Sequence, residues 1–256
     1  MKKVFLILIL PFLSWSQEAI FVEQTKLEAD TFIGIDSYND LFYIQDQVLY
    51  KKTETDLFNF KDFQLGEIHT VDIINPMNIT VYYANFNTVI LLDNKLTEIE
   101  RINFNIHSEF INTSTATLAA NTSLWVFNID SQQLESYNYR SKNKVLVSQP
   151  IQGEVLSQVS NYNFCFILTA EKIRAYNIYG SLIAEIENEG FVKIVQLNEN
   201  LIALKDNELY YIDKKTKEIT KIKSPEINIK DLQLTQDFLY IYDGKQVHTF
   251  KLTLPK

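Results

Sequence analysis

Residues 191–222 read FVKIVQLNENLIALKDNELYYIDKKTKEITKI, four short apolar runs separated by polar turns. None of the runs shows a helical period, and turn-type residues such as Asn200 and Asp213 stand between them. Asn and Asp tolerate left-handed backbone and hydrogen-bond within their own turn, which a tight connection between strands requires. This stretch therefore predicts four consecutive β-strands joined by short turns.

The same pattern recurs along the chain. Six apolar runs directly follow a turn-type residue, and successive runs begin 38, 37, 48, 37 and 37 residues apart. The six runs are Leu41–Ile44, Ile79–Tyr83, Ala116–Ala120, Phe164–Leu168, Leu201–Leu204 and Phe238–Tyr242. A period of about 40 residues filled with short strands is typical of a β-propeller, in which each repeat forms one four-stranded blade. The sequence predicts an all-β fold, a six-bladed β-propeller, with each run as the second strand of a blade.

The third repeat is longer than the others. Its second, third and fourth strands are predicted at Ala116–Ala120, Leu124–Ile129 and Leu134–Arg140. The interval to the next repeat is 48 residues where 37 is expected, and Ser141–Gly153, which contains a proline and a glycine, has no equivalent elsewhere. We predict a long loop here between blades 3 and 4, either a functional insertion or an ordinary tolerated one.

The two ends of the chain predict how the ring closes. The sixth repeat has room for three strands before Lys256, and Ala19–Leu27 is an extended, apolar-rich segment ahead of the first repeat. If this segment pairs as the outer strand of blade 6, no sheet edge is left open there to aggregation. We therefore predict that an N-terminal strand closes the last blade.

The first residues have the pattern of a secretory signal peptide. Lys2 and Lys3 form a basic start, and Val4–Leu13 forms an apolar core too short to anchor the chain across a bilayer. Ser14 and Ser16 supply small residues for cleavage. The sequence predicts a signal peptide at 1–16 and a single β-propeller domain at 17–256, exported to the periplasm or outside the cell and soluble, with no integral membrane segment in the mature chain.

The mature chain is acidic. Residues 1–16 hold two Lys and no acid, so the net charge changes from −8 to −10, with 22 Lys and Arg against 32 Asp and Glu. The basic residues are interspersed with the acids rather than clustered. Such a chain has no electrostatic reason to bind nucleic acid, which is therefore not an expected partner.

The residues that most often do chemistry are not arranged for it. Cys165 is the single cysteine, and its place inside the apolar run Phe164–Leu168 is typical of a buried thiol. The three histidines fall in different repeats, with no second ligand at metal-binding spacing. The sequence shows no Ser-His-Asp arrangement and no phosphate-binding glycine loop. We predict no catalytic residue and no cofactor, and we favour a protein that is not an enzyme.

Two passages resemble a known superfamily. Residues 209–219 (LYYIDKKTKEI) and 125–131 (WVFNIDS) resemble the strand, Asp turn and strand of quinoprotein-like repeats, within the YVTN, WD40-like and quinoprotein-like propellers. The Gly-His and Trp-Asp pairs of WD40 blades are absent, as are the Thr-Gly and closing Trp of quinone-binding repeats, so the resemblance implies no quinone. The short signal ending near Ser-Gln, with abundant Asn, Ile and Lys, resembles exported propeller proteins of flavobacteria, within the Bacteroidota.

Three acids support a second hypothesis. Asp72, Glu109 and Asp231 each stand seven residues before the apolar run of their repeat, on the predicted innermost strands that line a propeller's channel. Carboxylate oxygens from several segments are the ligands that Ca²⁺ takes. A resemblance to six-bladed calcium-dependent lactonases would imply such a metal and a hydrolase that uses these acids. Alternatively, the acids hydrogen-bond neighbouring backbone or channel water.

The first hypothesis is a non-catalytic scaffold that binds an envelope or secreted protein. In a propeller, the turns between second and third strands and the connections between blades crowd onto one face. The predicted residues of this binding face are Gln45, Asn85, Phe86, Asn87, Asn121, Glu171, Asp206 and Asp243. Phe86 is the best single anchor, because an aromatic side chain among polar turn residues suits a buried contact, although packing on its own blade is the alternative. A glycan-binding module is a third possibility that rests on aromatic content alone.

Overall fold

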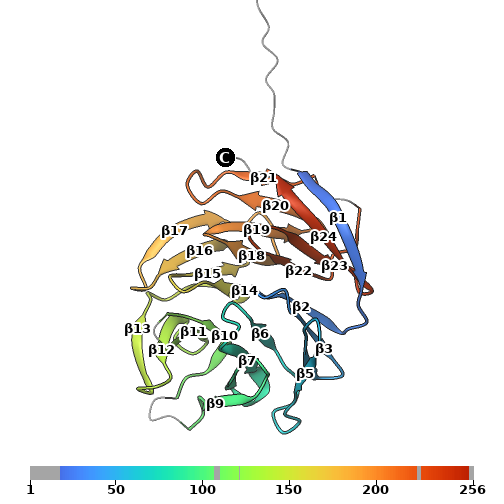
Figure 1. Cartoon of the computed structure of the whole chain (residues 1–256). Coiled ribbons are helices and arrows are strands. Elements are labelled where there is room, and N and C mark those ends of the chain that lie inside the picture. Colours follow the sequence, from blue (N-terminus) through green and yellow to red (C-terminus); the bar gives the residue numbers. More distant parts are fainter. Residues whose placement is uncertain (1–17, 107–109, 121, 224–225, 254–256) are drawn as a thin grey trace, which may run out of the picture.

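The computed structural model describes residues 18–106, 110–120, 122–223 and 226–253, so the predicted signal peptide lies outside the described residues. Six antiparallel sheets of four strands each stand around a common axis as a six-bladed β-propeller (Figure 1). The predicted fold class is confirmed. Within the described ranges, the helical structure is one 3₁₀ turn, η1 (Ala84–Phe86), and no helix is long and apolar enough to cross a membrane.

Each blade runs from an inner strand beside the axis to an outer strand at the rim. Blade 1 comprises β2 (Thr31–Ile35), β3 (Leu41–Gln45), β4 (Val48–Lys52) and β5 (Leu57–Phe60). Blade 2 comprises β6 (Thr70–Asp72), β7 (Ile79–Tyr83), β8 (Thr88–Leu92) and β9 (Glu98–Asn103). Blade 3 comprises β10 (Thr113–Leu118), β11 (Ser123–Asn128), β12 (Gln133–Asn138) and β13 (Asn143–Val147).

The second half of the ring repeats this order. Blade 4 comprises β14 (Val155–Ser160), β15 (Phe164–Thr169), β16 (Lys172–Asn177) and β17 (Leu182–Glu187). Blade 5 comprises β18 (Lys193–Leu197), β19 (Asn200–Lys205), β20 (Glu208–Ile212) and β21 (Ile219–Lys221). Blade 6 comprises β22 (Asp231–Leu234), β23 (Leu239–Tyr242), β24 (Gln246–Thr253) and, from the other end of the chain, β1 (Glu18–Lys26).

The two ends of the chain close the ring as predicted. β1 pairs antiparallel with β24, from Glu18 opposite Thr253 to Lys26 opposite Gln246, with a register shift between Phe21 and Glu23. The sheet order β1-β24-β23-β22 makes β1 the outer strand of blade 6, and the blue and red ends of the chain lie side by side (Figure 1). The last blade is therefore built from both ends of the described chain.

The predicted strand order of blade 3 is wrong by one strand. The run Ala116–Ala120, predicted as the second strand, overlaps the inner strand β10, and β11 is the second strand. The segment Ser141–Gly153, predicted as a loop, contains the outer strand β13. Second strands then begin 38, 44, 41, 36 and 39 residues apart, so the excess near residue 141 disappears.

The error has a physical cause. Ala116 and Leu118 of β10 are buried against blade 2, so this inner strand is as apolar as a second strand. In β13, exposed residues alternate with half-buried ones, and its exposed Val145 and Val147 make an ordinary rim strand look like an irregular segment in the sequence. Apolarity alone therefore does not identify the second strand of a blade.

The core is divided among the six gaps between blades. Each gap holds its own cluster of buried apolar side chains contributed by the two sheets that face it. The gap between blades 6 and 1, where the ring closes, contains Phe32, Tyr242 and Val247. Burying one large apolar side chain contributes about 1.5–3 kcal/mol, so every blade depends on both of its neighbours.

The inner strands of blades 6 and 1 meet at a glycine. Gln233 of β22 donates from Nε2 to the carbonyl oxygen of Ile35 at 2.9 Å, and its Oε1 accepts from the Ile35 N–H at 2.7 Å. A Cβ on Gly34 would lie 2.5 Å from Cδ of Gln233, and the φ of Gly34 is +153°. Glycine therefore leaves room for the side chain of Gln233, and it adopts this positive φ without the strain that a Cβ would add.

Removal of β1 is expected to destabilise the whole ring. A chain that begins at residue 29 loses the outer strand of blade 6 together with the buried Ala19 and Leu27. We expect the melting temperature to fall by roughly 10 °C or more, since 1 kcal/mol corresponds to about 2–4 °C in a domain of this size. Thermal unfolding followed by circular dichroism tests this, with a chain beginning at residue 17 as the control. Equal melting temperatures would show that β1 does not hold the ring.

Gly34→Ala is expected to lower the free energy of unfolding by about 1–3 kcal/mol, because the new Cβ displaces Gln233 and breaks its two bonds to Ile35. In a Gln233→Ala background the same substitution is expected to cost less, since the obstructing amide is gone. Denaturant unfolding of the four variants measures this coupling. Strictly additive effects would contradict it.

Candidate functional site

The predicted channel acid Asp72 is bonded to the next blade. It lies at the end of β6, and its Oδ2 accepts a hydrogen bond from the N–H of Leu118 in β10 at 2.8 Å. Its Oδ1 accepts from the N–H of Ile74 at 2.9 Å. Burial raises the pKa of Asp72, and these two hydrogen bonds oppose the rise. The carboxylate therefore joins the inner strands of blades 2 and 3.

Asp231 makes a similar bond from blade 6, although it is the first residue of its inner strand, β22, whereas Asp72 is the last residue of β6. Its Oδ2 accepts from the N–H of Phe32 in β2 at 3.0 Å, and its Oδ1 lies 3.3 Å from Nζ of Lys193. Ser157 of the inner strand β14 in blade 4 contacts the backbone of Ile194 in blade 5 at 3.4–3.5 Å. Polar side chains on three inner strands thus tie one blade to the next.

The third predicted ligand, Glu109, lies outside the described residues. The part of the chain that the structure describes contains no group of three or more His, Cys, Asp or Glu side chains able to hold a metal ion. Asp72 and Asp231 accept hydrogen bonds from neighbouring backbone, which is the alternative to calcium ligation. Calcium binding in the channel stays a prediction of the sequence.

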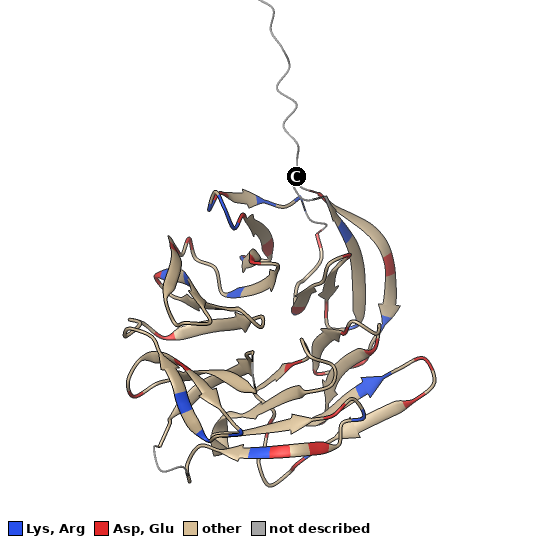
Figure 2. Ribbon diagram, turned by 60° about the vertical axis from the view of Figure 1, so that its left-hand side comes forward, with Lys and Arg blue, Asp and Glu red and all other residues tan. Residues whose placement is uncertain are grey.

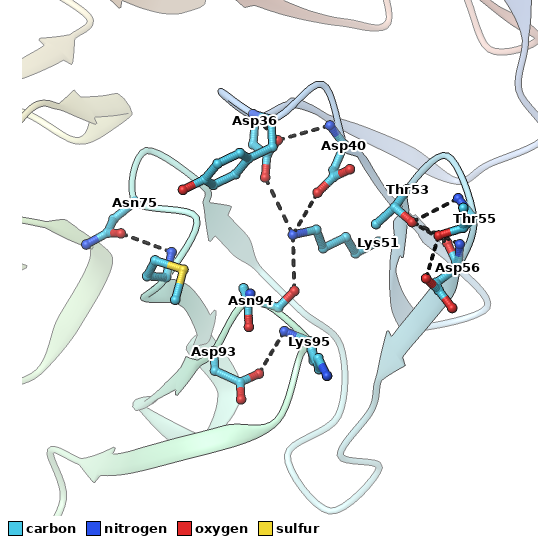
Figure 3. A network of polar contacts seen from close by, with 12 residues as sticks. Asp36, Asp40, Lys51, Thr53, Thr55, Asp56, Asn75, Asp93, Asn94 and Lys95 are labelled. Atoms are coloured by element: carbon cyan, nitrogen blue, oxygen red, sulfur yellow. Dashed lines mark hydrogen bonds and ion pairs between the residues drawn. The ribbon is translucent and has the colours of Figure 1, made fainter.

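Lys51 is a buried cation that the sequence analysis did not single out. From β4, its Nζ lies 3.0 Å from Oδ2 of Asp40 and 3.6 Å from Oδ2 of Asp36, and its side chain is 3% exposed. It also donates to the carbonyl oxygen of Asn94, in the turn between β8 and β9, at 3.1 Å (Figure 3). A buried amine beside acids is a common catalytic pattern. Here its neighbours join blade 1 to blade 2, which gives Lys51 a structural role.

The predicted binding face is formed by two kinds of segment, which we call together the connection face. They are the turns between second and third strands and the connections between successive blades, including residues 27–30 ahead of blade 1. Asn87 in blade 2 donates to the carbonyl oxygen of Ile111 at 2.6 Å and accepts from the N–H of Thr113 at 3.2 Å.

Asn207 in blade 5 repeats this arrangement. Its amide donates to the carbonyl oxygen of Ile227 at 2.7 Å and accepts from the N–H of Ile229 at 2.6 Å. In both blades the asparagine directly before the third strand bonds a carbonyl oxygen and an N–H group, two residues apart, in the backbone that leads into the next blade. These bonds fix each turn against the connection beside it.

The predicted residues of the connection face differ in accessibility. Gln45 and Asp243 are half-buried, while the exposed members are Asn85, Phe86, Glu171 and Asp206. Asn87 is buried at 7% exposure and held by its internal bonds, so it supports the face from below. Asn121 lies outside the described residues, and the turn between second and third strands of blade 3 is Ile129–Gln132.

Asp243 is partly sheltered by a histidine. Its Oδ2 lies 2.8 Å from Nε2 of His248, and its Oδ1 accepts from the N–H groups of Lys245 and Gln246. Burial would raise the pKa of Asp243, but these hydrogen bonds outweigh it and lower the pKa below its usual value. The contacts bind this residue into its own turn.

Four apolar side chains gather on the connection face between blades 2 and 3. Phe86 is 47% exposed, Ile106 80%, Phe110 54% and Ile129 41%. Their segments are bonded to one another: Asn105 donates to the carbonyl oxygen of Phe86 at 2.9 Å, and the N–H of Ile129 donates to the carbonyl oxygen of Asn112 at 2.7 Å. We call these four residues the apolar patch.

Of the four residues of the apolar patch, Phe86 is the one that the sequence indicates as a contact residue. Ile129 was assigned to the end of a strand because the strand order of blade 3 was wrong. Ile106 and Phe110 belong to the connection 104–112, FNIHSEFIN, whose apolar residues follow neither a strand nor a helix period. The position of this connection directly after the outer strand of blade 2 is the sequence feature that would place Ile106 and Phe110 on the connection face.

The connection face is more acidic than the opposite face. Within the described residues, its turns and connections hold twelve Asp and Glu against four Lys. The turns of the opposite face hold nine Asp and Glu against six Lys and Arg. The charged residues lie mainly on outer strands and in turns, with acids distributed around the ring (Figure 2).

Two further features do not offer a site. Cys165 is fully buried, and desolvation raises the pKa of its thiol well above the usual value, so it is no nucleophile. The crevice between blades 4 and 5, near Phe166 and Leu201, has room of about 30 Å³. That volume holds about one water molecule, which is too small for a substrate.

No protein-family model and no curated protein matches the chain. Similar solved structures include a chain of the mitotic checkpoint complex, with a TM-score of 0.64 at 9% identity over 98% of both chains. Virginiamycin B lyase from Staphylococcus aureus gives 0.62 at 10% identity over 86% of this chain and 79% of its own. The Neurospora crassa Pan2 WD40 domain gives 0.60 at 6% identity over 91% and 75%. At these identities the likeness establishes the propeller fold alone.

Lys51→Met is expected to lower the free energy of unfolding by about 3–5 kcal/mol, because it leaves the buried carboxylate of Asp36 without its cation. Lys52→Met is the matched control, since the neighbouring side chain is exposed, and it is expected to change stability by about 0.5 kcal/mol or less. Denaturant unfolding measures both. Equal effects of the two substitutions on the free energy of unfolding would show that Lys51 has no special structural role.

Proposed function

We propose that this protein is a non-catalytic, exported scaffold that binds another protein of the cell envelope through its connection face. The observation that carries the proposal is the apolar patch, four exposed side chains from two adjacent blades on one side of the ring. An exposed apolar group of this kind, surrounded by polar residues, is typical of a protein-interaction site.

The construction of the face supports this role. Asn87 and Asn207 fix their turns against the neighbouring connections by paired hydrogen bonds. A surface ordered before binding loses less conformational entropy when a partner docks, which favours affinity. Phe86 projects from such a fixed turn, because the carbonyl oxygen of its own residue accepts bonds from Thr88 and Asn105.

The fold is compatible with this proposal without deciding it. Similar structures include a WD40 domain and a chain of a multiprotein checkpoint complex, and also a lyase. Propellers host many unrelated activities, so function has to be argued from the site. Export rests on the basic start, short apolar core and small residues of 1–16.

Site-specific photocrosslinking in the native cell tests the proposal. Phe86→p-benzoylphenylalanine is expected to give a discrete crosslinked species whose second component mass spectrometry identifies as an exported protein. The same photoreactive residue in place of Tyr179, an exposed aromatic in a turn of the opposite face, is the matched control and is expected to give no such species.

The possible results separate clearly. A partner crosslinked from position 179 and not from position 86 would leave a scaffold but move its binding surface to the other face. No crosslinked partner from either position would overturn the scaffold function. A cytoplasmic partner would overturn the exported location.

A further inference from the structure

We infer that the apolar patch binds a basic polypeptide segment, one in which apolar or aromatic side chains are flanked by Lys and Arg. The inference rests on the proposed scaffold function and names the chemistry of its partner. It follows from two properties of the same surface, the exposed apolar side chains and the excess of acids around them.

The apolar side chains supply the contact area. Phe86 and Phe110 are aromatic, are about half exposed, and belong to segments joined by the bond from Asn87 to the Ile111 carbonyl oxygen. Ile106 and Ile129 extend the patch along blades 2 and 3. Aromatic side chains surrounded by less critical contacts are the usual centres of binding energy at protein interfaces.

The charges near the apolar patch indicate which residues should stand beside the apolar residues of the partner segment. Asp130 follows Ile129 directly and is exposed, and its Oδ1 accepts from Asn112 at 2.9 Å. Glu67 is exposed in the connection 61–69 and follows Gly66, where an added Cβ would lie 3.9 Å from the side-chain Nδ2 of Asn85, the residue before Phe86. One exposed carboxylate is therefore adjacent to Ile129 in the chain, and another follows a residue close to the turn that carries Phe86.

Another nearby acid has a local cation. Asp62 pairs with Arg101 at 2.8 Å, so this carboxylate contributes less to the field over the patch. The wider face nevertheless holds twelve acids against four Lys within the described residues. Its charge favours a cationic partner and opposes an acidic one, both at contact and during approach.

The same charge opposes a second copy of this chain as the occupant. The chain has a net charge of −8, and two connection faces brought together would place acid against acid. Like-charge juxtaposition costs affinity and slows association. A basic segment of another polypeptide is the occupant that fits both the apolar and the charged parts of the surface.

Fluorescence anisotropy with defined peptides tests the inference on the full mature chain. The probes are labelled peptides KKFRKLKK and EEFDELEE, which share apolar residues and differ in the sign of their charge. We expect the basic peptide to bind at least about tenfold more tightly than the acidic one. Raising the salt from about 50 mM to about 250 mM is expected to weaken its binding at least about threefold.

Substitutions locate the binding. Phe86→Ala and Phe110→Ala are each expected to weaken the basic peptide about tenfold, as loss of a central aromatic contact does. Glu67→Lys is expected to weaken it at least about threefold through charge. Tyr179→Ala removes an exposed aromatic from the opposite face and is the matched control, with binding expected to be unchanged. Circular dichroism confirms that each variant is folded.

The outcomes distinguish this inference from the scaffold function. Equal binding of the two peptides, or basic-peptide binding that Phe86→Ala leaves unchanged, overturns the inference. If the native partner crosslinks at position 86 and neither peptide binds, the scaffold function stands and the partner chemistry is wrong. If the basic peptide binds as expected and no native partner crosslinks at position 86 or 179, the surface chemistry stands and the scaffold function fails.

Discussion

Closure of the ring is the constraint on which the rest of this structure depends. A blade is a twisted four-stranded sheet with apolar side chains on both faces, so it is stable only between two neighbours. Six clusters fill the six gaps, and in the last of them Leu27, directly after β1, lies in one cluster with Val247 of β24, from the opposite end of the chain. With its single cysteine unpaired, the protein has no disulfide to hold the ring, and burial between blades supplies the stability.

Hydrogen bonds between the inner strands of neighbouring blades add specificity to this apolar packing. Apolar faces can slide past one another, whereas side chains such as Asp72, Ser157 and Gln233 bond to particular backbone groups of the next blade. These bonds set the register between blades, and Gly34 provides the space that one of them needs. Asp72 and Asp231 share one offset in the sequence and therefore suggest a set of metal ligands, but the strand registers place them at opposite ends of their inner strands, each bonded to the next blade.

Much of the architecture could be predicted from the sequence, and less of the surface. The repeat and the turn residues predicted six blades, and an unassigned apolar segment predicted β1. Blade 3 was misplaced by one strand because Ala116 and Leu118 make its inner strand unusually apolar. Asn87 looked like a surface residue, since a sequence cannot show that a turn amide points inward to Ile111. Lys51 and Ile106 were missed because their burial and exposure depend on contacts between distant segments.

On the connection face, the side chains that hold the turns in place differ from the apolar side chains that are exposed to a partner. The bonds that hold its turns are made by amides and backbone groups, as at Asn87 and Asn207, so the order of the turns does not depend on the exposed apolar side chains. The six gaps are filled by other residues, and none of their clusters includes Phe86, Ile106 or Phe110. Single exposed apolar residues need no explanation, but several on neighbouring, mutually bonded segments form a surface that folding alone does not require. The ring therefore fixes this surface in place while leaving its side chains free to contact a partner.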